Sequence, residues 1–387
     1  MKHQKILLLS MIVVIIFSII YLESLKPKNN SSSDTTIVDT QLILPHNSNE
    51  TQNEKTSQDT ARIQLKAKTY QIAKELVAPQ GYFNIENNIG NNKENITLAE
   101  YIGKKVILVD FWTYSCINCQ RTIPYLNSWY EKYKDQGLII IGVHTPEFEF
   151  EKDYLNVKRA IEKFNIHYPV VQDNDYNTWR AYKNRYWPRK YLIDIDGFII
   201  YDHIGEGAYT DTEQKIIVAL QERNDLLKIT ANEINKTIDT STIQTSIKIP
   251  QFQNINTPEL YFGYNFNRGQ LGNQEGLNPN EIITYTLPQN IKKNKFYLQG
   301  IWKNNADNME VIEKPGKIIL KYDAKTVNIV AGSLKEQAIK VFLDGKYQQN
   351  INISHFDLYQ IIDQDYGEHT LELELPPGIM MYTFTFG

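Results

Sequence analysis

Cysteine is nearly absent from this chain of 387 residues, which contains only Cys116 and Cys119. A secreted scaffold held together by several disulfides is therefore excluded, because one bond between near neighbours closes too short a loop to stabilise a fold. A basic surface is also lacking, since 41 Lys and Arg against 45 Asp and Glu leave a net charge of −4. Sequence-independent binding to nucleic acid depends on many cationic contacts with phosphate. We therefore expect no nucleic-acid partner.

What is present is enough chain for two to three domains and a globular composition, with 42% hydrophobic and 22% charged residues. Shifts in composition along the chain divide it into five segments. We expect a membrane anchor at residues 1–22, a polar tether at 23–77, an α/β domain at 78–226, a linker at 227–248 and an all-β domain at 249–387.

A long apolar run lies at the N-terminus, from Ile6 to Leu22. At about 1.5 Å per residue, such a helix nearly crosses a hydrocarbon core of about 30 Å. No small-x-small cleavage site follows, which favours a single transmembrane helix over a cleaved signal peptide. Because Lys2 and Lys5 favour a cytoplasmic N-terminus, the rest of the chain is expected on the extracytoplasmic face of the cytoplasmic membrane.

The tether is rich in Ser, Thr, Asn and Gln up to about residue 60. A segment of this composition buries too little apolar surface to offset the cost of ordering. Apolar residues at helical spacing then predict a short amphipathic helix over residues 60–78, leading into the first domain.

Residues 78–226 alternate between the patterns of buried strands and helices. A nearly continuous apolar run at 105–112 predicts a strand buried on both faces. Helical spacing follows as far as Gly137, and a second apolar run comes directly after it. This order is typical of a right-handed crossover in a parallel sheet. We expect further strands at 138–143, 168–172, 191–194 and 198–203, and further helices at 151–164, 176–184 and 212–223.

Residues 249–387 show short alternating runs separated by turn residues. Such regular spacing favours a two-sheet β-sandwich. The candidate strands are 282–287, 296–302, 317–322, 326–330, 339–343, 348–353, 356–362, 369–375 and 379–386.

The two cysteines stand at a predicted strand-to-helix junction, in the sequence Cys116-Ile117-Asn118-Cys119. The unpaired N–H groups and the dipole at a helix N-terminus stabilise a thiolate, so Cys116 is expected to be the attacking sulfur. Cys119 follows one turn later on the same face and can resolve a mixed disulfide. The spacing therefore predicts a dithiol switch.

Two other interpretations of the cysteine pair remain open. Half of a zinc site is one, although zinc needs two further ligands, and only His144 and His203 lie at strand ends from which they could approach. A buried pair of structural thiols is the other, although an exposed pair would oxidise outside the cytosol. We expect neither a metal nor a cofactor.

The segment 109–119, Val-Asp-Phe-Trp-x-x-x-Cys-Ile-Asn-Cys, together with Pro124, resembles the thioredoxin superfamily. Short motifs at 97–105 and 168–173 look like its membrane-anchored TlpA-like branch. The sequences of residues 111–126 and of the C-terminal end at 382–387 are similar to the soluble part of DipZ-type proteins. The resemblance covers about residues 78–387 and implies a thioredoxin-like fold with thiol–disulfide oxidoreductase activity.

The same resemblance implies roles for residues around the cysteines. Asp110 would be a buried carboxylate that relays a proton from Cys119. Pro188 would be a cis-proline that presents an extended partner chain, with Trp187 beside it. These two residues would form part of the client-binding surface.

Two more residues near the cysteines are assigned to that surface. Trp112 either packs beneath the active-site loop or is a plain core tryptophan. Ser115 stands where thioredoxins usually carry Trp, so the client-facing surface must differ. Because Ile117 and Asn118 replace the usual Gly-Pro, and these residues affect the reduction potential, the direction of electron flow stays open.

For the C-terminal domain, the resemblance implies a carbohydrate-binding-module-like sandwich. Five aromatic residues could stack on a sugar, although core packing and domain docking are favoured because aromatics are major core formers. They are Tyr261, Phe262, Tyr264, Phe266 and Trp302. Paired acids such as Glu147 and Glu149 are interpreted as solvated strand-end residues rather than as a glycosidase pair.

The expected partners are protein thiol or disulfide clients and a separate membrane electron donor or acceptor, since one apolar span cannot replace a multi-helix electron-delivering domain. A glycan at the β domain is a further candidate. One alternative function is a surface glycan- or protein-binding module on an inactive redox scaffold. Another is a peroxidase-like thiol enzyme, because Thr113 stands three residues before Cys116.

Overall fold

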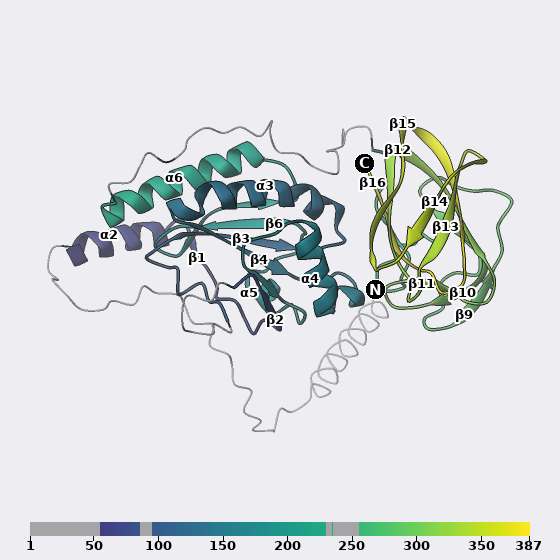
Figure 1. Cartoon of the computed structure of the whole chain (residues 1–387), viewed down its shortest axis with the longest axis horizontal. Coiled ribbons are helices and arrows are strands. Elements are labelled where there is room, and N and C mark those ends of the chain that lie inside the picture. Colours follow the sequence, from purple (N-terminus) through teal and green to yellow (C-terminus); the bar gives the residue numbers. More distant parts are fainter. Residues whose placement is uncertain (1–54, 86–94, 230–233, 235–254) are drawn as a thin grey trace, which may run out of the picture. The chain divides into compact units, whose positions relative to one another are not determined.

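The computed structural model describes residues 55–85, 95–229, 234 and 255–387. The expected transmembrane helix at residues 1–22, most of the tether and most of the linker lie outside these residues. In the described part of the chain, no helix combines the length and the apolar character that crossing a membrane requires. The described residues fold into an α/β region and a β-rich region (Figure 1).

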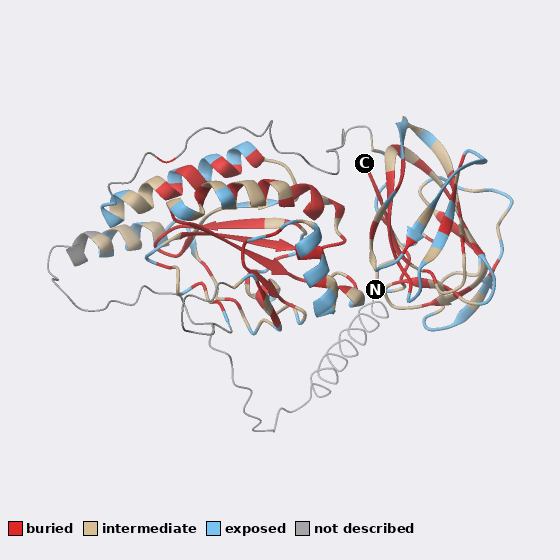
Figure 2. Ribbon diagram, in the orientation of Figure 1, coloured by how far each residue is buried: buried red, intermediate tan, exposed pale blue. Residues whose placement is uncertain are grey.

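The α/β region is built on a seven-stranded sheet with the order β1-β7-β6-β3-β4-β5-β2. At its centre, β3 (Val106–Trp112) runs parallel to β4 (Leu138–His144) and antiparallel to β6 (Arg189–Ile193). Every residue of β3 and β4 is buried, as Figure 2 shows, which confirms the prediction from their apolar runs. The remaining strands are β1 (Gln71–Ile72), β2 (Gly81–Phe83), β5 (Val170–Gln172) and β7 (Phe198–Ile204).

Helices pack on both faces of this sheet because side chains alternate along β3. On one face, α3 (Ile117–Tyr133), α4 (Tyr154–Lys163) and α6 (Tyr209–Leu227) share a core with Val106 and Leu108. On the other face, Ile107 and Val109 pack with residues that lie between β1 and β3 in the chain and with Trp179 of α5 (Asn177–Ala181). Asp110 therefore points to the same face as α3, which carries Cys119.

The predicted helix at 60–78 is wrong in its extent, because α2 (Lys55–Ala67) ends earlier and Gln71–Ile72 forms an edge strand. The packing also places residues before 78 in the folded region. Ala73 and Leu76 are buried in the core, and the Arg62 guanidinium pairs with Asp196. The tether expected to reach residue 77 thus contains part of the domain, since burial on a distant face of the sheet is not visible in local composition.

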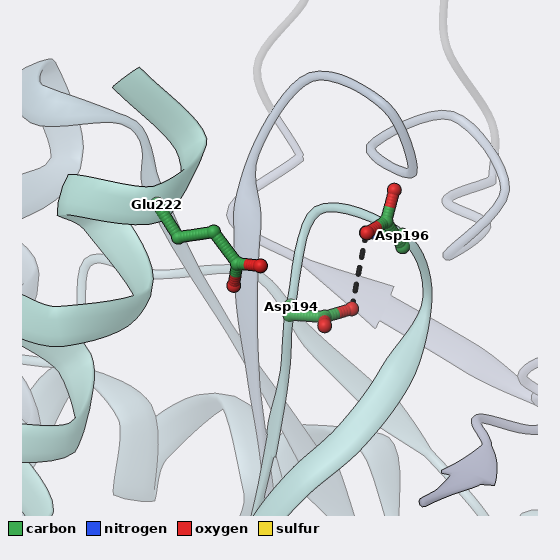
Figure 3. A group of neighbouring side chains, drawn as sticks. All are labelled: Asp194, Asp196 and Glu222. Carbon is green, nitrogen blue, oxygen red and sulfur yellow. Dashed lines mark hydrogen bonds between the residues drawn. The ribbon is translucent and has the colours of Figure 1, made fainter. Parts of the chain in front are cut away.

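The carboxylates of Asp194, Asp196 and Glu222 lie close together (Figure 3). Asp194 and Asp196 stand in the turn between β6 and β7, and Glu222 stands on α6. The Lys66 ammonium lies among them, with Nζ at 2.6 Å from Asp194, 2.8 Å from Asp196 and 2.7 Å from Glu222. A lysine at this place supplies the positive charge that a bound cation would otherwise supply. The cluster is an ion-pair network that fastens α2 to the sheet and to α6.

The β-rich region forms one hydrogen-bonded network of nine strands with the path β14-β13-β15-β12-β10-β11-β16-β8, and β9 pairs with β10. Two of the predicted strand pairs merge into long strands, β12 (Gly316–Gly332) and β15 (Asp357–Leu375). The polar residues read as turns instead form a register shift between Ala324 and Thr326 opposite residues 363–367. The all-β class agrees with the prediction, whereas the division into two sheets stays a prediction.

The other strands of this region are β8 (Leu260–Tyr261), β9 (Ile282–Tyr285), β10 (Phe296–Asn304), β11 (Met309–Val311), β13 (Gln337–Leu343), β14 (Lys346–Ile353) and β16 (Met380–Phe386). Phe262 and Trp302, two of the aromatics considered for sugar stacking, are 0% exposed and belong to the core. They cannot stack on a sugar from solution, so the core-packing interpretation holds for both.

The two regions share a small apolar cluster. Ile117 and Phe148 from the α/β region pack with Val330, Leu358 and Tyr382 from the β-rich region. Polar contacts surround this cluster, including Tyr114 Oη donating to the Phe356 carbonyl at 3.2 Å and Lys163 pairing with Asp357 at 2.7 Å. The segment after β4, including the short 3₁₀ helix η2 (Glu149–Lys152), supplies much of this contact.

Candidate active site

The two cysteines lie where β3 gives way to α3. Cys116 is the N-cap residue of the helix, and its sulfur accepts a hydrogen bond from the Cys119 N–H at 3.4 Å. Both thiols are free, with Cys116 partly exposed and Cys119 1% exposed. Burial, together with the neighbouring Cys116, raises the pKa of the Cys119 thiol. The arrangement has an accessible sulfur at a helix N-terminus and a protonated, shielded sulfur one turn later.

Asp110 is the residue that the family resemblance assigns as the proton relay. It is 1% exposed, and its Oδ1 has no hydrogen-bond partner among the described residues. Burial raises the pKa of Asp110 to about 7, an effect that the positive charge of Lys190 opposes. The negative charge of Asp110 in turn raises the pKa of the Cys119 thiol.

Lys190 is a residue near the site that the sequence analysis did not identify. It is 0% exposed, stands opposite Asp110 in the register of β3 and β6, and donates to the Gly205 carbonyl at 3.2 Å. Burial lowers the pKa of Lys190, while Asp110 and Cys119 favour its charged form. The available signal was a lysine two residues after Pro188, directly before the run Tyr191-Leu192-Ile193.

Trp187 lines the same cavity as Cys116, and Pro188 follows it in the chain. The Trp187–Pro188 peptide bond is cis, the isomer that the family resemblance implies. The Trp187 indole Nε1 donates to the Thr145 carbonyl at 3.0 Å, and its ring lies 4.3 Å from that of Trp179. These contacts hold the side chain in place beside Cys116 in the cavity wall.

Trp112 and Ser115 are both inside the protein. Trp112 is 0% exposed and meets His144 edge to face at 5.1 Å, so it is a core tryptophan beneath the active-site turn. Ser115 is 1% exposed, and its hydroxyl donates to Glu151 Oε1 at 2.6 Å. A client-facing role for Ser115 therefore extends no further than lining the cavity, because its hydroxyl is already engaged.

The histidines named for a zinc site do not join the cysteines. Burial lowers the pKa of His144 to about 3, so this ring is neutral, and it packs on Trp112 and Tyr114. The His203 Nε2 lies 3.1 Å from the Glu206 carbonyl. Among the residues that the structure describes, the one group of three possible metal-ligating side chains is the ion-pair network around Lys66.

A small cavity of about 80 Å³ lies beside Cys116, with room for a few water molecules. Both regions of the chain contribute to its walls. From the α/β region it is lined by Ser115, Cys116, Ile117, Asn118, Glu147 and Trp187, and from the β-rich region by Glu259, Tyr261, Val330, Thr383 and Thr385.

Glu147 is the clearest correction to the sequence analysis. It was interpreted as a solvated strand-end acid, yet it lies half-buried in the cavity wall. The Tyr261 hydroxyl stands 3.0 Å from Glu147 Oε1 and also 3.0 Å from Glu259 Oε2. Burial, reinforced by Glu259 and Glu151, raises the pKa of Glu147 to about 8. No local pattern reveals this site, because Glu147 and Tyr261 are 114 residues apart in the sequence.

Two family models match the chain. Residues 77–202 match the AhpC/TSA family, and residues 257–387 match the thioredoxin like C-terminal domain. These two stretches correspond to the α/β region and to the β-rich region.

Three curated relatives illustrate the similarity. The chain is 36% identical over 286 residues to protein DipZ of Mycobacterium bovis, which covers 73% of this chain and 39% of DipZ. It thus spans about two fifths of DipZ. It is 30% identical to the thiol-disulfide oxidoreductase YkuV of Bacillus subtilis, over 33% of this chain and 85% of YkuV. The thiol-disulfide oxidoreductase ResA of Bacillus cereus is 30% identical, over 35% of this chain and 82% of ResA.

Proposed function

The chain belongs to the thioredoxin-like thiol–disulfide oxidoreductases, and we propose that it exchanges disulfides with protein clients through Cys116 and Cys119. The observation that carries this proposal is the position of Cys116. Its sulfur caps α3 at the edge of a cavity, while the second sulfur is buried one turn away. Such a pair can form a bond to a client and then release it.

In the reducing direction, the Cys116 thiolate attacks one sulfur of a client disulfide. A new S–S bond forms between Cys116 and the client, and the second client sulfur leaves with the bonding electron pair. Cys119 then attacks Cys116 Sγ, which releases the first client sulfur and leaves the chain oxidised. The opposite sequence of steps oxidises a client dithiol, and the geometry serves both directions equally.

Asp110 is proposed to take the proton that Cys119 must lose before it attacks. Its carboxyl lies on the face of the sheet that α3 covers, and it is coupled electrostatically to Cys119. A buried carboxylate with a pKa near neutrality is suited to accept a proton from a thiol and return it later. Lys190 acts on this step only indirectly, because it favours the charged form of Asp110.

Pro188 and Trp187 are proposed to form the client-binding edge next to Cys116. A proline has no N–H, which leaves neighbouring backbone groups free to pair with an extended client segment.

We also propose that the chain is anchored by one helix over residues 6–22 and acts on the extracytoplasmic side of the cytoplasmic membrane. The support is the apolar run and the lysines that precede it. A separate membrane protein would then exchange electrons with the pair. The full-length protein should sediment with membranes, and a variant lacking residues 1–22 should appear in the soluble fraction. Recovery of both forms in the same fraction would contradict the anchor.

Trapping of a client intermediate tests the roles of the two sulfurs. With Cys119→Ala in the full-length protein, we expect a mixed disulfide to accumulate, because Cys116 can attack but nothing resolves the product. With Cys116→Ala, no such product is expected. Non-reducing gel electrophoresis and mass spectrometry of the adduct provide the readout. Equal behaviour of the two variants would refute the assignment, and hydrogen peroxide consumption above that of Cys116→Ala would favour the peroxidase alternative.

A further inference from the structure

A hydrogen-bonded chain of three side chains joins the two regions at the wall of the cavity beside Cys116. Tyr261 Oη lies 3.0 Å from an oxygen of Glu147 and 3.0 Å from an oxygen of Glu259. The phenol has one proton, so it can donate to only one carboxylate at a time. Two carboxylates that share a single donor in a confined site repel each other, which favours the presence of a further proton on one of them.

Among the carboxyls near Cys116, Glu147 is the best placed to hold that proton. Glu151 is fully buried, but its carboxylate accepts hydrogen bonds from Ser115 Oγ at 2.6 Å and from the N–H groups of Glu147 and Phe148 at 2.6 and 2.9 Å. Burial raises the pKa of Glu151, and these donors oppose that rise because they stabilise its ionised form. The Glu147 carboxyl is bonded only by Tyr261 among the described residues, and Glu147 is half-buried whereas Glu259 is an exposed residue.

We propose that Glu147, held in position by Tyr261 and Glu259 of the β-rich region, is a catalytic acid–base that exchanges a proton with the client sulfur. The inference rests on the proposed function and assigns to the second region a part in the chemistry. Tyr261 occupies Oε1 of Glu147, which leaves Oε2 to carry the proton. Cys116 and Glu147 both line the same small cavity, so a sulfur that departs there meets both groups.

The step balances as follows. Cys116 Sγ forms a bond with one client sulfur, the client S–S bond breaks, and the departing sulfur keeps the electron pair as a thiolate. Glu147 transfers its proton to that thiolate and becomes a carboxylate. The product is a neutral client thiol, and solvent or the reverse reaction returns a proton to Glu147. Without this transfer, a thiolate would remain beside several carboxyl groups, which is unfavourable.

The protonation of Glu147 depends on the groups that face it from both regions. Glu151 and Glu259 oppose its ionisation, whereas the Tyr261 hydroxyl and the positive charge of Arg268 favour it. Burial dominates and raises the pKa of Glu147 to about 8. The acid is therefore protonated near neutral pH, the condition for donating to an alkyl thiolate.

An unsatisfied group on the same wall supports a polar occupant of the cavity. The Thr385 hydroxyl is 4% exposed, and it has no hydrogen-bond partner among the described residues. It lines the cavity together with Glu147 and Cys116. A buried hydroxyl without a partner is costly, but the Thr385 hydroxyl can bond to water or to a small polar group of the client that reaches the cavity.

The test compares two uncharged disulfides that differ in the leaving group. Bis(2-hydroxyethyl) disulfide releases an alkyl thiolate, which needs a proton, whereas 4,4′-dithiodipyridine releases a stable thiopyridone, which needs none from the enzyme. In the reduced full-length protein, Glu147→Gln should slow the alkyl disulfide about tenfold or more and change the rate with the aromatic disulfide less than about twofold. Rates of mixed-disulfide formation are followed by acid quench and mass spectrometry.

The pH dependence sharpens the result. With the alkyl disulfide, the wild-type rate constant, corrected for the thiolate fraction of Cys116, should fall as the pH rises through about 8, and this fall should be absent in Glu147→Gln. Glu259→Gln should move the fall to lower pH, because it removes a negative charge that opposes ionisation of Glu147. This shift separates positioning through Glu259 from a merely structural role.

Glu149→Gln is the matched control, since Glu149 lies two residues away on the exposed surface and pairs with Lys152 at 2.7 Å. It should leave both rates unchanged. If Glu147→Gln slows both disulfides equally or neither, the inference is overturned while the proposed function stands. If the wild type reacts with neither disulfide faster than Cys116→Ala does, the proposed function itself fails.

Discussion

The two regions of the chain differ in what they bury. In the described residues of the α/β region, eight charged side chains are buried, namely Asp110, Arg121, Glu151, Asp173, Lys190, Asp194, Asp196 and Glu213. In the described residues of the β-rich region, the buried polar side chains are those of Asn, Thr and Ser. Burying charge is costly unless it is paired or used. Several of the charges in the first interior are held in ion pairs, such as Arg121 with Glu206 and Asp194 with Lys66. The described interior of the second region holds no charged side chain.

The difference has an exception at the contact between the regions. Tyr261 and Glu259 come from the β-rich region, yet they stand at the cavity beside Cys116. At this contact, the β-rich region thus contributes polar side chains to the cavity wall. The predictions below test how much the buried charge of the α/β region and the contact between the two regions contribute to stability and to reactivity, from the largest expected effect to the smallest.

The largest effect is expected from the buried acid of the α/β region. Burial raises the pKa of Asp110 from 3.8 to about 7, so the folded state binds its proton more tightly than the unfolded state does. Stability from this group is fully present below about pH 4 and is lost as the pH rises through about 7. Asp110→Asn should therefore raise the free energy of unfolding by up to about 3 kcal/mol more at pH 8 than at pH 5. The absolute gain is smaller, because the substitution also removes the charge that favours the ionised form of the buried Lys190.

Guanidinium unfolding of the reduced wild type and of Asp110→Asn, at pH 5 and at pH 8, measures this effect. The matched control is Asn328→Asp, which introduces a carboxyl at a fully buried position of the β-rich region. A gain for Asp110→Asn of the same size at both pH values would show that the charge is not the cause.

The contact between the regions should be tested next. Phe148 is 2% exposed and packs against Tyr382 at a ring distance of 5.1 Å. Phe148→Ala should lower the free energy of unfolding by about 3 kcal/mol, because it leaves a cavity in the shared apolar cluster. Phe342→Ala, at a partly exposed position of β13, should cost much less. Equal losses would mean that the shared cluster adds little to stability.

A third prediction concerns the resolving step. If Asp110 accepts the proton of Cys119, Asp110→Asn should slow resolution of a preformed mixed disulfide on Cys116 by about 100-fold. The wild-type rate should rise with pH through about 7, because the carboxylate is the active form, and this rise should vanish in the variant. Stopped-flow tryptophan fluorescence follows the reaction. An unchanged pH profile in the variant would remove Asp110 from the mechanism.

The smallest effect is expected from the β-rich side of the cavity. Tyr261→Phe removes the hydrogen bond that favours ionised Glu147 but keeps the ring, so the pKa of Glu147 should rise. We expect the rate with an alkyl disulfide to fall by only about three- to tenfold, because Glu147 loses one hydrogen bond that holds it in position. The neighbouring Tyr264→Phe, whose hydroxyl bonds to Asn280, serves as the control. Identical effects of the two variants would argue against a special role for Tyr261.

Much of the α/β region could be predicted from local patterns. The apolar runs of β3 and β4 and the helical spacing of α3 are strong signals, because fully buried strands and amphipathic helices leave them in any sequence. The length of α2 and of the long strands β12 and β15 could not be predicted. In α2 the ion-pair network around Lys66, and in β12 the register shift beside Ala324, involve partners that are far away in the sequence, so local patterns do not reveal them.

By itself, the sequence determined the sulfur chemistry, since two cysteines at one helical turn after a buried strand place one thiol at a helix N-terminus and the other within reach of it. Only the tertiary structure decided the surroundings of that pair. Lys190 reaches Asp110 through strand pairing, and Glu147 meets Tyr261 through the contact between the regions. The physical reason is range, because helix and strand signals act over a few residues, whereas the charge state of a buried group depends on every neighbour that folding brings to it.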